Sequence, residues 1–96
     1  MADVRGIVQG TQSIAVGAFL DILPPVGEEW MIANIYHGGA AELYKYDGVN
    51  SQLIDDDVES GAWLQWKWFV VRDNYLRVKN VSGAAALISY EGVRTK

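Results

Sequence analysis

The sequence predicts an all-β fold, a single antiparallel β-sandwich or small barrel of about eight strands. Turn signals recur roughly every 8–12 residues. The segments between them are rich in aromatic and β-branched residues, which suit a pleated sheet. No segment has the 3.6-residue period of an amphipathic helix. No linker, repeat or low-complexity tract divides the 96 residues, so we expect one domain over 1–96.

The stretch from Trp63 to Val71 has the strongest pattern, because its nine residues hold three of the four tryptophans. We predict a central strand here. Its wholly apolar face is assigned to the core and holds Leu64, Trp66, Trp68 and Val70. The opposite, mixed face holds Trp63, Gln65, Lys67 and Phe69. On that face Trp63 is equally compatible with core packing and with an exposed anchor for a partner.

The remaining strands are predicted from alternation and from the turns that bound them. In chain order they are Val4–Gln9, Ser13–Val16, Phe19–Leu23, Trp30–Tyr36, Ala41–Tyr46, Ser51–Ile54, Tyr75–Asn80 and Ala85–Tyr90. Glycine, proline and aspartate predict the main turns, at Gly10-Thr11, Pro24-Pro25, Gly38-Gly39, Asp47-Gly48 and Glu91-Gly92. Residues 1–20 are predicted to be either edge strands or an N-terminal arm.

The composition argues against several classes of function. The net charge is −4 and the eight Lys and Arg residues are scattered, so nucleic acid is not an expected partner. The chain has no cysteine, which excludes disulfides, thiol nucleophiles and thiolate metal sites. No apolar run suits a signal peptide or reaches the roughly 20 residues of a membrane span. We therefore expect a soluble protein that is made in a cytoplasm and has no membrane partner.

The sequence offers little support for catalysis. His37 is the only histidine, and it precedes two glycines in a predicted flexible turn. A general base must instead be held rigidly beside a nucleophile. The serines lie in turn and strand contexts that lack the strained elbow of a nucleophile. We expect no enzyme and no cofactor.

An acidic loop is predicted over Asp55–Gly61, where Asp55, Asp56, Asp57 and Glu59 cluster. Calcium binds such carboxylates, but the spacing does not match the alternating acids of a calcium loop. We therefore expect a solvated loop without a metal. A contact patch for a basic partner surface is a further interpretation.

Two segments resemble small virion proteins of tailed phages, which decorate or cement the capsid or sit on the tail. They are PPVGEEWMIANIYHGGAAELYKYDG (Pro24 to Gly48) and NYLRVKNVSGAAALISYEGV (Asn74 to Val93). The resemblance implies a compact β-sandwich of jelly-roll type, often assembled as a homotrimer. It covers the C-terminal three quarters of the chain.

The resemblance implies a head decoration or cement protein that binds the major capsid protein on the capsid surface. The alternative is a β-sandwich module that binds a glycan or receptor from a phage tail or fibre. Six residues are the candidates for partner contact: Trp63, Gln65, Lys67, Asp55, Asp56 and Asp57.

Overall fold

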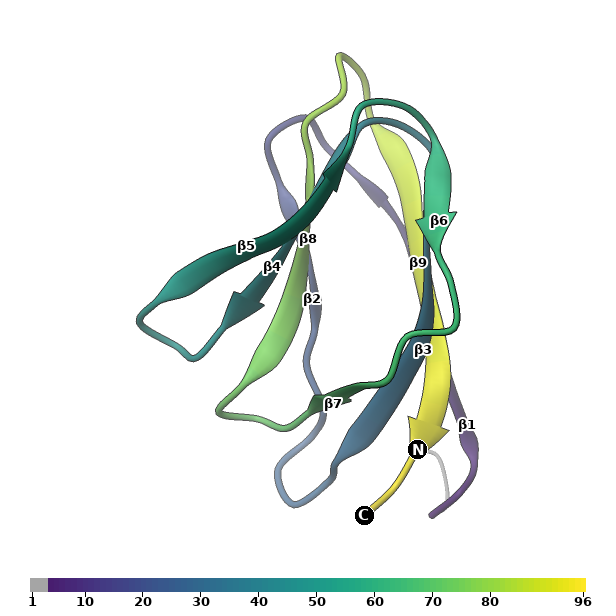
Figure 1. Cartoon of the computed structure of the whole chain (residues 1–96), viewed down its shortest axis with the longest axis vertical. Helices are drawn as coiled ribbons and strands as arrows, with labels where there is room; N and C mark the ends of the chain where they lie inside the picture. Colours follow the sequence, from purple (N-terminus) through teal and green to yellow (C-terminus); the bar gives the residue numbers. More distant parts are fainter. Residues whose placement is uncertain (1–3) are drawn as a thin grey trace.

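A computed structural model describes residues 4–96, which form nine strands and no helix. The strands are β1 (Ile7–Ile14), β2 (Phe19–Ile22), β3 (Trp30–His37), β4 (Ala41–Tyr46), β5 (Ser51–Asp57), β6 (Gly61–Trp63), β7 (Trp68–Val70), β8 (Tyr75–Asn80) and β9 (Ala86–Arg94). Two sheets face each other, and the β4–β5 hairpin projects from one side (Figure 1). Within residues 4–96 there is no helix long and apolar enough to cross a membrane.

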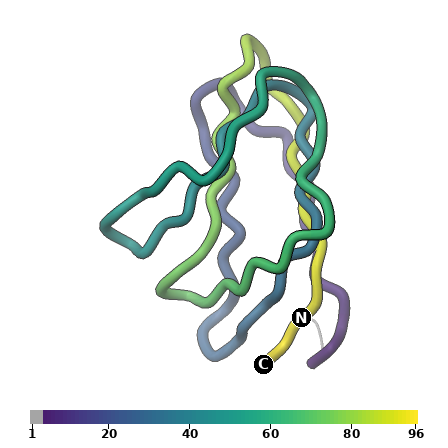
Figure 2. The backbone as a smooth tube through the Cα atoms, viewed as in Figure 1, coloured from purple at the N-terminus to yellow at the C-terminus, as the bar shows by residue number. Residues whose placement is uncertain are grey.

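The strand order is that of a jelly roll. One sheet has the order β1-β9-β3-β6, with β7 also paired to β3, and the other has the order β2-β8-β4-β5. All pairs of strands within the two sheets are antiparallel. The first strand therefore pairs with the last, and β1 and β9 lie side by side in the backbone trace (Figure 2). This confirms the predicted jelly-roll sandwich, which consists of two interlocked Greek keys.

The core lies between the sheets, where alternate residues of each strand point inward. In β8 the inward residues Leu76, Val78 and Asn80 are buried, whereas Arg77 and Lys79 are only partly covered. The fully buried apolar side chains include Ile22, Ile32, Leu43, Val70 and Val78. Asn80 is the polar member of this layer, and its amide donates to the carbonyls of Ile14 and Ala84.

Two predicted turns are wrong, because long-range pairing outweighs the local signal. Gly10-Thr11 lies inside β1, all eight residues of which are paired with β9. Glu91-Gly92 lies inside β9. A Cβ at position 92 would collide with the carbonyl oxygen of Met31, so this glycine permits a close approach of two strands. The predicted strands Ala41–Tyr46 and Tyr75–Asn80 are confirmed without change.

The tryptophan-rich stretch is not one central strand. It forms β6 and β7, which both pair with β3 at the edge of its sheet. Gln65, between them, has a φ of 60°, in the left-handed region that few residues other than glycine adopt. This turn breaks the alternation, so Leu64 points to solvent and Trp63 to the core. The assignment of Leu64 to the core was therefore wrong, whereas Val70 is buried and Trp66 and Trp68 pack against the core as predicted.

Candidate functional site

Trp63 is a core residue with 5% of its surface exposed, so it is not an exposed anchor. Its indole nitrogen donates to Oδ2 of Asp55 at 3.1 Å. Its ring centroid lies 4.6 Å from that of His37. The turn at Gln65 causes this inward orientation, and it removes Trp63 from the candidate partner contacts.

His37 is also buried, with 3% exposure, at the end of β3 rather than in a flexible turn. Its Nδ1 lies 2.9 Å from the carbonyl oxygen of Gly39, and its Nε2 lies 2.8 Å from Oδ2 of Asp57. A carbonyl oxygen only accepts, so Nδ1 carries a hydrogen and donates to it. The Asp57 carboxylate is the partner of Nε2, so both ring nitrogens are engaged in hydrogen bonds. Neither ring nitrogen is left free to act as a base.

The acidic residues belong largely to a strand, because β5 runs to Asp57. The predicted loop is therefore shorter than expected. Asp55 and Asp57 point toward Trp63 and His37, whereas Asp56 is exposed. Within residues 4–96 no three His, Cys, Asp or Glu side chains are gathered as a metal site would require. Two of the acidic side chains instead bind β5 to the opposite sheet.

Gln65 and Lys67 are the two predicted contact residues that remain on the surface near the tryptophans. The backbone nitrogen of Gln65 donates to Oδ1 of Asn34 at 2.9 Å, which holds the turn against β3. Lys67 lines an open groove of about 260 Å³ together with Lys45, Trp68, Phe69, Val70, Asn74, Tyr75 and Leu76. We call this the aromatic groove.

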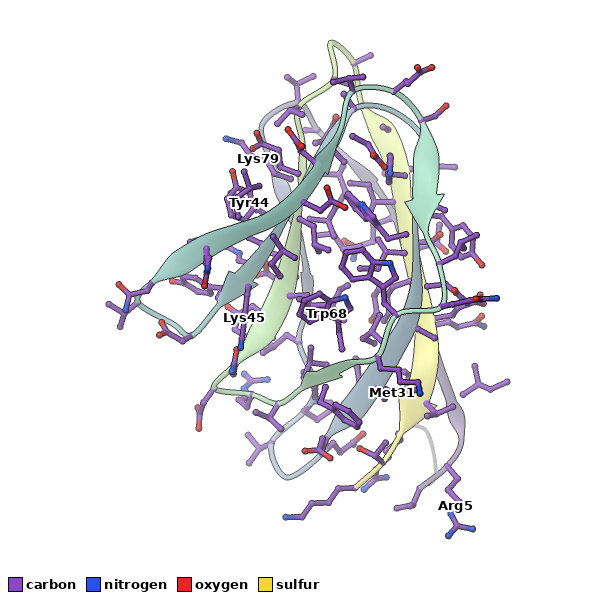
Figure 3. All side chains as sticks on the ribbon, viewed as in Figure 1. Arg5, Met31, Tyr44, Lys45, Trp68 and Lys79 are labelled. Atoms are coloured by element: carbon purple, nitrogen blue, oxygen red, sulfur yellow. The ribbon has the colours of Figure 1, made fainter. Side chains whose placement is uncertain are left out.

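The aromatic groove lies where the sandwich opens beneath the β4–β5 hairpin. Figure 3 shows Trp68 between the two sheets and Lys45 below β4. The rings of Trp66 and Trp68 are 5.2 Å apart and tilted by 35°. The indole nitrogen of Trp68 is buried and has no hydrogen-bond partner among residues 4–96. A groove with aromatic walls and two lysines can stack on a flat, polar ligand.

An apolar row crosses the outer face of the β1-β9-β3-β7 sheet. The pairing places Ile7 beside Val93, Val93 beside Met31, and Met31 beside Phe69. Ile7 is 73% exposed and Phe69 is 61% exposed, and Val93 and Met31 are partly exposed between them. Sequence reasoning missed this row, because its four residues come from four strands and only the pairing register brings them together.

The outer face of the other sheet carries cations over aromatic rings. The Arg77 guanidinium lies 4.1 Å from the ring centroid of Phe19 and 4.7 Å from that of Tyr46, and Nε of Arg77 donates to Asp21. Tyr44 donates to Glu42 at 2.6 Å, and this hydrogen bond raises the pKa of Tyr44. The charged and polar groups of this face already pair with one another. The apolar row is therefore the better candidate for contact with a partner.

A scan of protein-family models and a comparison with curated proteins both gave no match to this chain.

Proposed function

We propose that this chain is a non-enzymatic structural protein of a tailed-phage virion, which binds the major capsid protein lattice as a decoration or cement protein. Two features support the proposal: the sequence resemblance of Pro24–Gly48 and Asn74–Val93, and the jelly-roll strand order. The observation that carries it is the apolar row of Ile7, Val93, Met31 and Phe69.

An apolar row on an exposed sheet face is more stable when a partner covers it. On a capsid each copy of the chain would meet the same surface of a repeated subunit. Many weak contacts of this kind then stabilise the shell, since a ligand that binds only the assembled form shifts the equilibrium toward assembly. The hydrogen bonds that occupy both nitrogens of His37 favour such a role over a catalytic one.

The test is to add the purified protein to capsids that lack it and to measure bound protein and the temperature of capsid disruption. The wild-type protein should bind and raise that temperature. Phe69→Ser should weaken binding at least tenfold, because it removes one end of the apolar row.

Leu87→Ser is the matched control, since Leu87 is 62% exposed on the same sheet face but lies beside Ser13, outside the row. It should bind as the wild type does. Absence of binding by the wild-type protein, or equal loss in the two variants, would contradict the proposal.

The second candidate function, a glycan-binding module of a tail or fibre, is favoured by the aromatic groove. Aromatic rings with nearby hydrogen-bond donors are suited to stacking on sugar rings. Tryptophan fluorescence should then change on titration with a binding sugar and should no longer change in Lys45→Ala. Lys79→Ala, on the opposite face of the same sheet, should behave as the wild type. A flat titration over a broad glycan panel would exclude this function.

A further inference from the structure

β1 is an unprotected sheet edge. It pairs with β9 on one side, and among residues 4–96 no strand pairs with its other side. Exposed edge strands normally carry charges, proline or a bulge that prevents pairing with another chain. The sequence of β1, IVQGTQSI, contains none of the charged residues and no proline, and its pairing with β9 has no bulge. Its free backbone groups are therefore available to another strand.

We propose that two copies of this chain associate through their β1 strands, antiparallel to each other about a twofold axis at Thr11. The β1-containing sheet of one copy would then join that of the other copy in one continuous sheet. Twofold-symmetric dimers can pair open sheet edges in this way. This inference does not rest on the proposed virion role. It replaces the homotrimer implied by the resemblance with a dimer.

The side chains of β1 are self-complementary in this register. Residues directly opposite in an antiparallel pair point to the same face. A twofold axis at Thr11 places Thr11 opposite Thr11 and Gln9 opposite Ser13 on the outer face. On the inner face it places Val8 opposite Ile14, which are both buried core residues. Thr–Thr and aliphatic pairs are favourable across strands, and no like charges meet.

The two neighbouring registers on the same faces fit less well. A twofold axis at Gln12 would place Ile14 opposite Gly10 and would leave Val8 with no residue of β1 opposite it. A twofold axis at Gly10 would place Val8 opposite the exposed Gln12 and would leave Ile14 with no residue of β1 opposite it. The apolar residues at the two ends of β1 then no longer meet. The register centred on Thr11 is therefore preferred.

A groove of about 450 Å³ beside β1 supports the same register. It is lined by Gly10, Thr11, Gln12, Phe19, Leu20, Asp21 and Tyr90, and it separates the edges of β1 and β2. The Tyr90 ring packs against Gly10, where a Cβ would come within 2.8 Å of it. Within residues 4–96 the Tyr90 hydroxyl makes no hydrogen bond. The proposed register places Gln12 of the second copy opposite Gly10, so that its amide covers the ring and can reach the hydroxyl.

Single-cysteine variants test both the contact and the register, because the natural chain has no cysteine. Oxidised Thr11→Cys should form a covalent dimer. Gln9→Cys alone should not, since its two copies would be four residues out of register, roughly 13 Å along the strand. A disulfide needs Cα atoms within about 7 Å. Ser13→Cys alone should also fail, whereas an equimolar mixture of Gln9→Cys and Ser13→Cys should cross-link.

Light scattering over a dilution series tests whether the dimer forms without a cross-link. The wild type should approach twice the 10.6 kDa mass of the chain. Thr11→Lys and Thr11→Glu should each raise the dissociation constant at least tenfold, because like charges would meet at the axis. Mixing the two variants should restore the dimer.

Ser51→Lys, an exposed change on β5, should leave the dimer intact. A wild-type mass of one or three chains, or Thr11→Cys that remains uncross-linked, would overturn the proposal. Capsid binding by the monomeric Thr11→Lys variant would then be measured separately, so failure of the dimer and failure of the virion role are distinguishable.

Discussion

Nε2 of His37 lies 2.8 Å from Oδ2 of Asp57, and this contact joins the two sheets of the sandwich, since His37 ends β3 and Asp57 ends β5. The histidine side chain is completely buried, whereas the side chain of Asp57 is 39% exposed. Next to it, the Trp63 indole donates to Asp55. The pair of contacts closes the sandwich at the edge where β5 faces β6.

The first prediction concerns this pair. His37→Ala should lower the free energy of unfolding by about 2–4 kcal/mol, because it removes buried ring packing as well as two hydrogen bonds. Asp57→Ala should cost about 1–2 kcal/mol, less because its carboxylate is partly solvated. Asp56→Ala should change the stability by no more than about 0.5 kcal/mol, since Asp56 is exposed. Urea unfolding measures all three, and equal effects of Asp56→Ala and Asp57→Ala would contradict the structural role.

The second prediction concerns the close approach of β9 to β3. Gly92→Ala should destabilise the protein by about 3 kcal/mol or more, because its methyl group would collide with the backbone of Met31 and Ile32. Gly83→Ala is the control, since a Cβ there meets no atom within 4 Å. Thermal unfolding of the two variants checks the prediction. A Gly92→Ala protein as stable as the wild type would show that the strands can move apart at little cost.

The third prediction concerns the turn between β6 and β7. Gln65 is exposed and has a φ of 60°, so changing its side chain tests backbone conformation with little loss of packing. Gln65→Val should be about 1–2 kcal/mol less stable than Gln65→Gly, because a β-branched residue is strained in the left-handed region. Chemical unfolding of the two variants gives the difference. If the two are equally stable, the turn does not hold this conformation in solution.

The strands could be predicted from the sequence where alternation and strong turn residues agree, as in Tyr75–Asn80. They could not be predicted where pairing with a distant strand determines the local conformation. Gly10 and Gly92 are turn signals by their chemistry, yet both lie in strands where a neighbouring chain segment takes the space of a side chain. Position 65 is the opposite case, because glutamine gives no local signal for the left-handed conformation that breaks the tryptophan-rich stretch.

The candidate functional surfaces were harder to predict, because each depends on residues far apart in the chain. His37 and Asp57 are 20 residues apart, and Ile7 and Phe69 reach the same row only through β9 and β3. Residue types indicated that Trp63 and the aspartates were candidates for partner contact. Without the register, neither the burial of Trp63 nor the exposure of the apolar row could be foreseen.

The last prediction concerns acid stability. Tyr36 donates to Oε1 of Glu91 at 2.6 Å and Asn34 donates to the same oxygen at 2.8 Å. These bonds favour the carboxylate and hold the pKa of Glu91 below its ordinary value of 4.5. Because the pKa of Glu91 is lower in the folded state than in the unfolded state, its ionised carboxylate stabilises the folded protein above pH 4.5. This stabilisation is lost as the pH falls through the folded-state pKa.

Glu91→Gln keeps an oxygen acceptor but cannot titrate, so its stability should fall less than that of the wild type between pH 6 and pH 3, roughly the range over which a glutamate titrates. Glu59→Gln, an exposed change in the β5–β6 turn, should follow the wild-type curve. Urea unfolding at each pH gives the comparison. Because Tyr36 and Asn34 lie on β3 and Glu91 lies on β9, parallel curves for Glu91→Gln and the wild type would mean that these cross-strand bonds do not persist in solution.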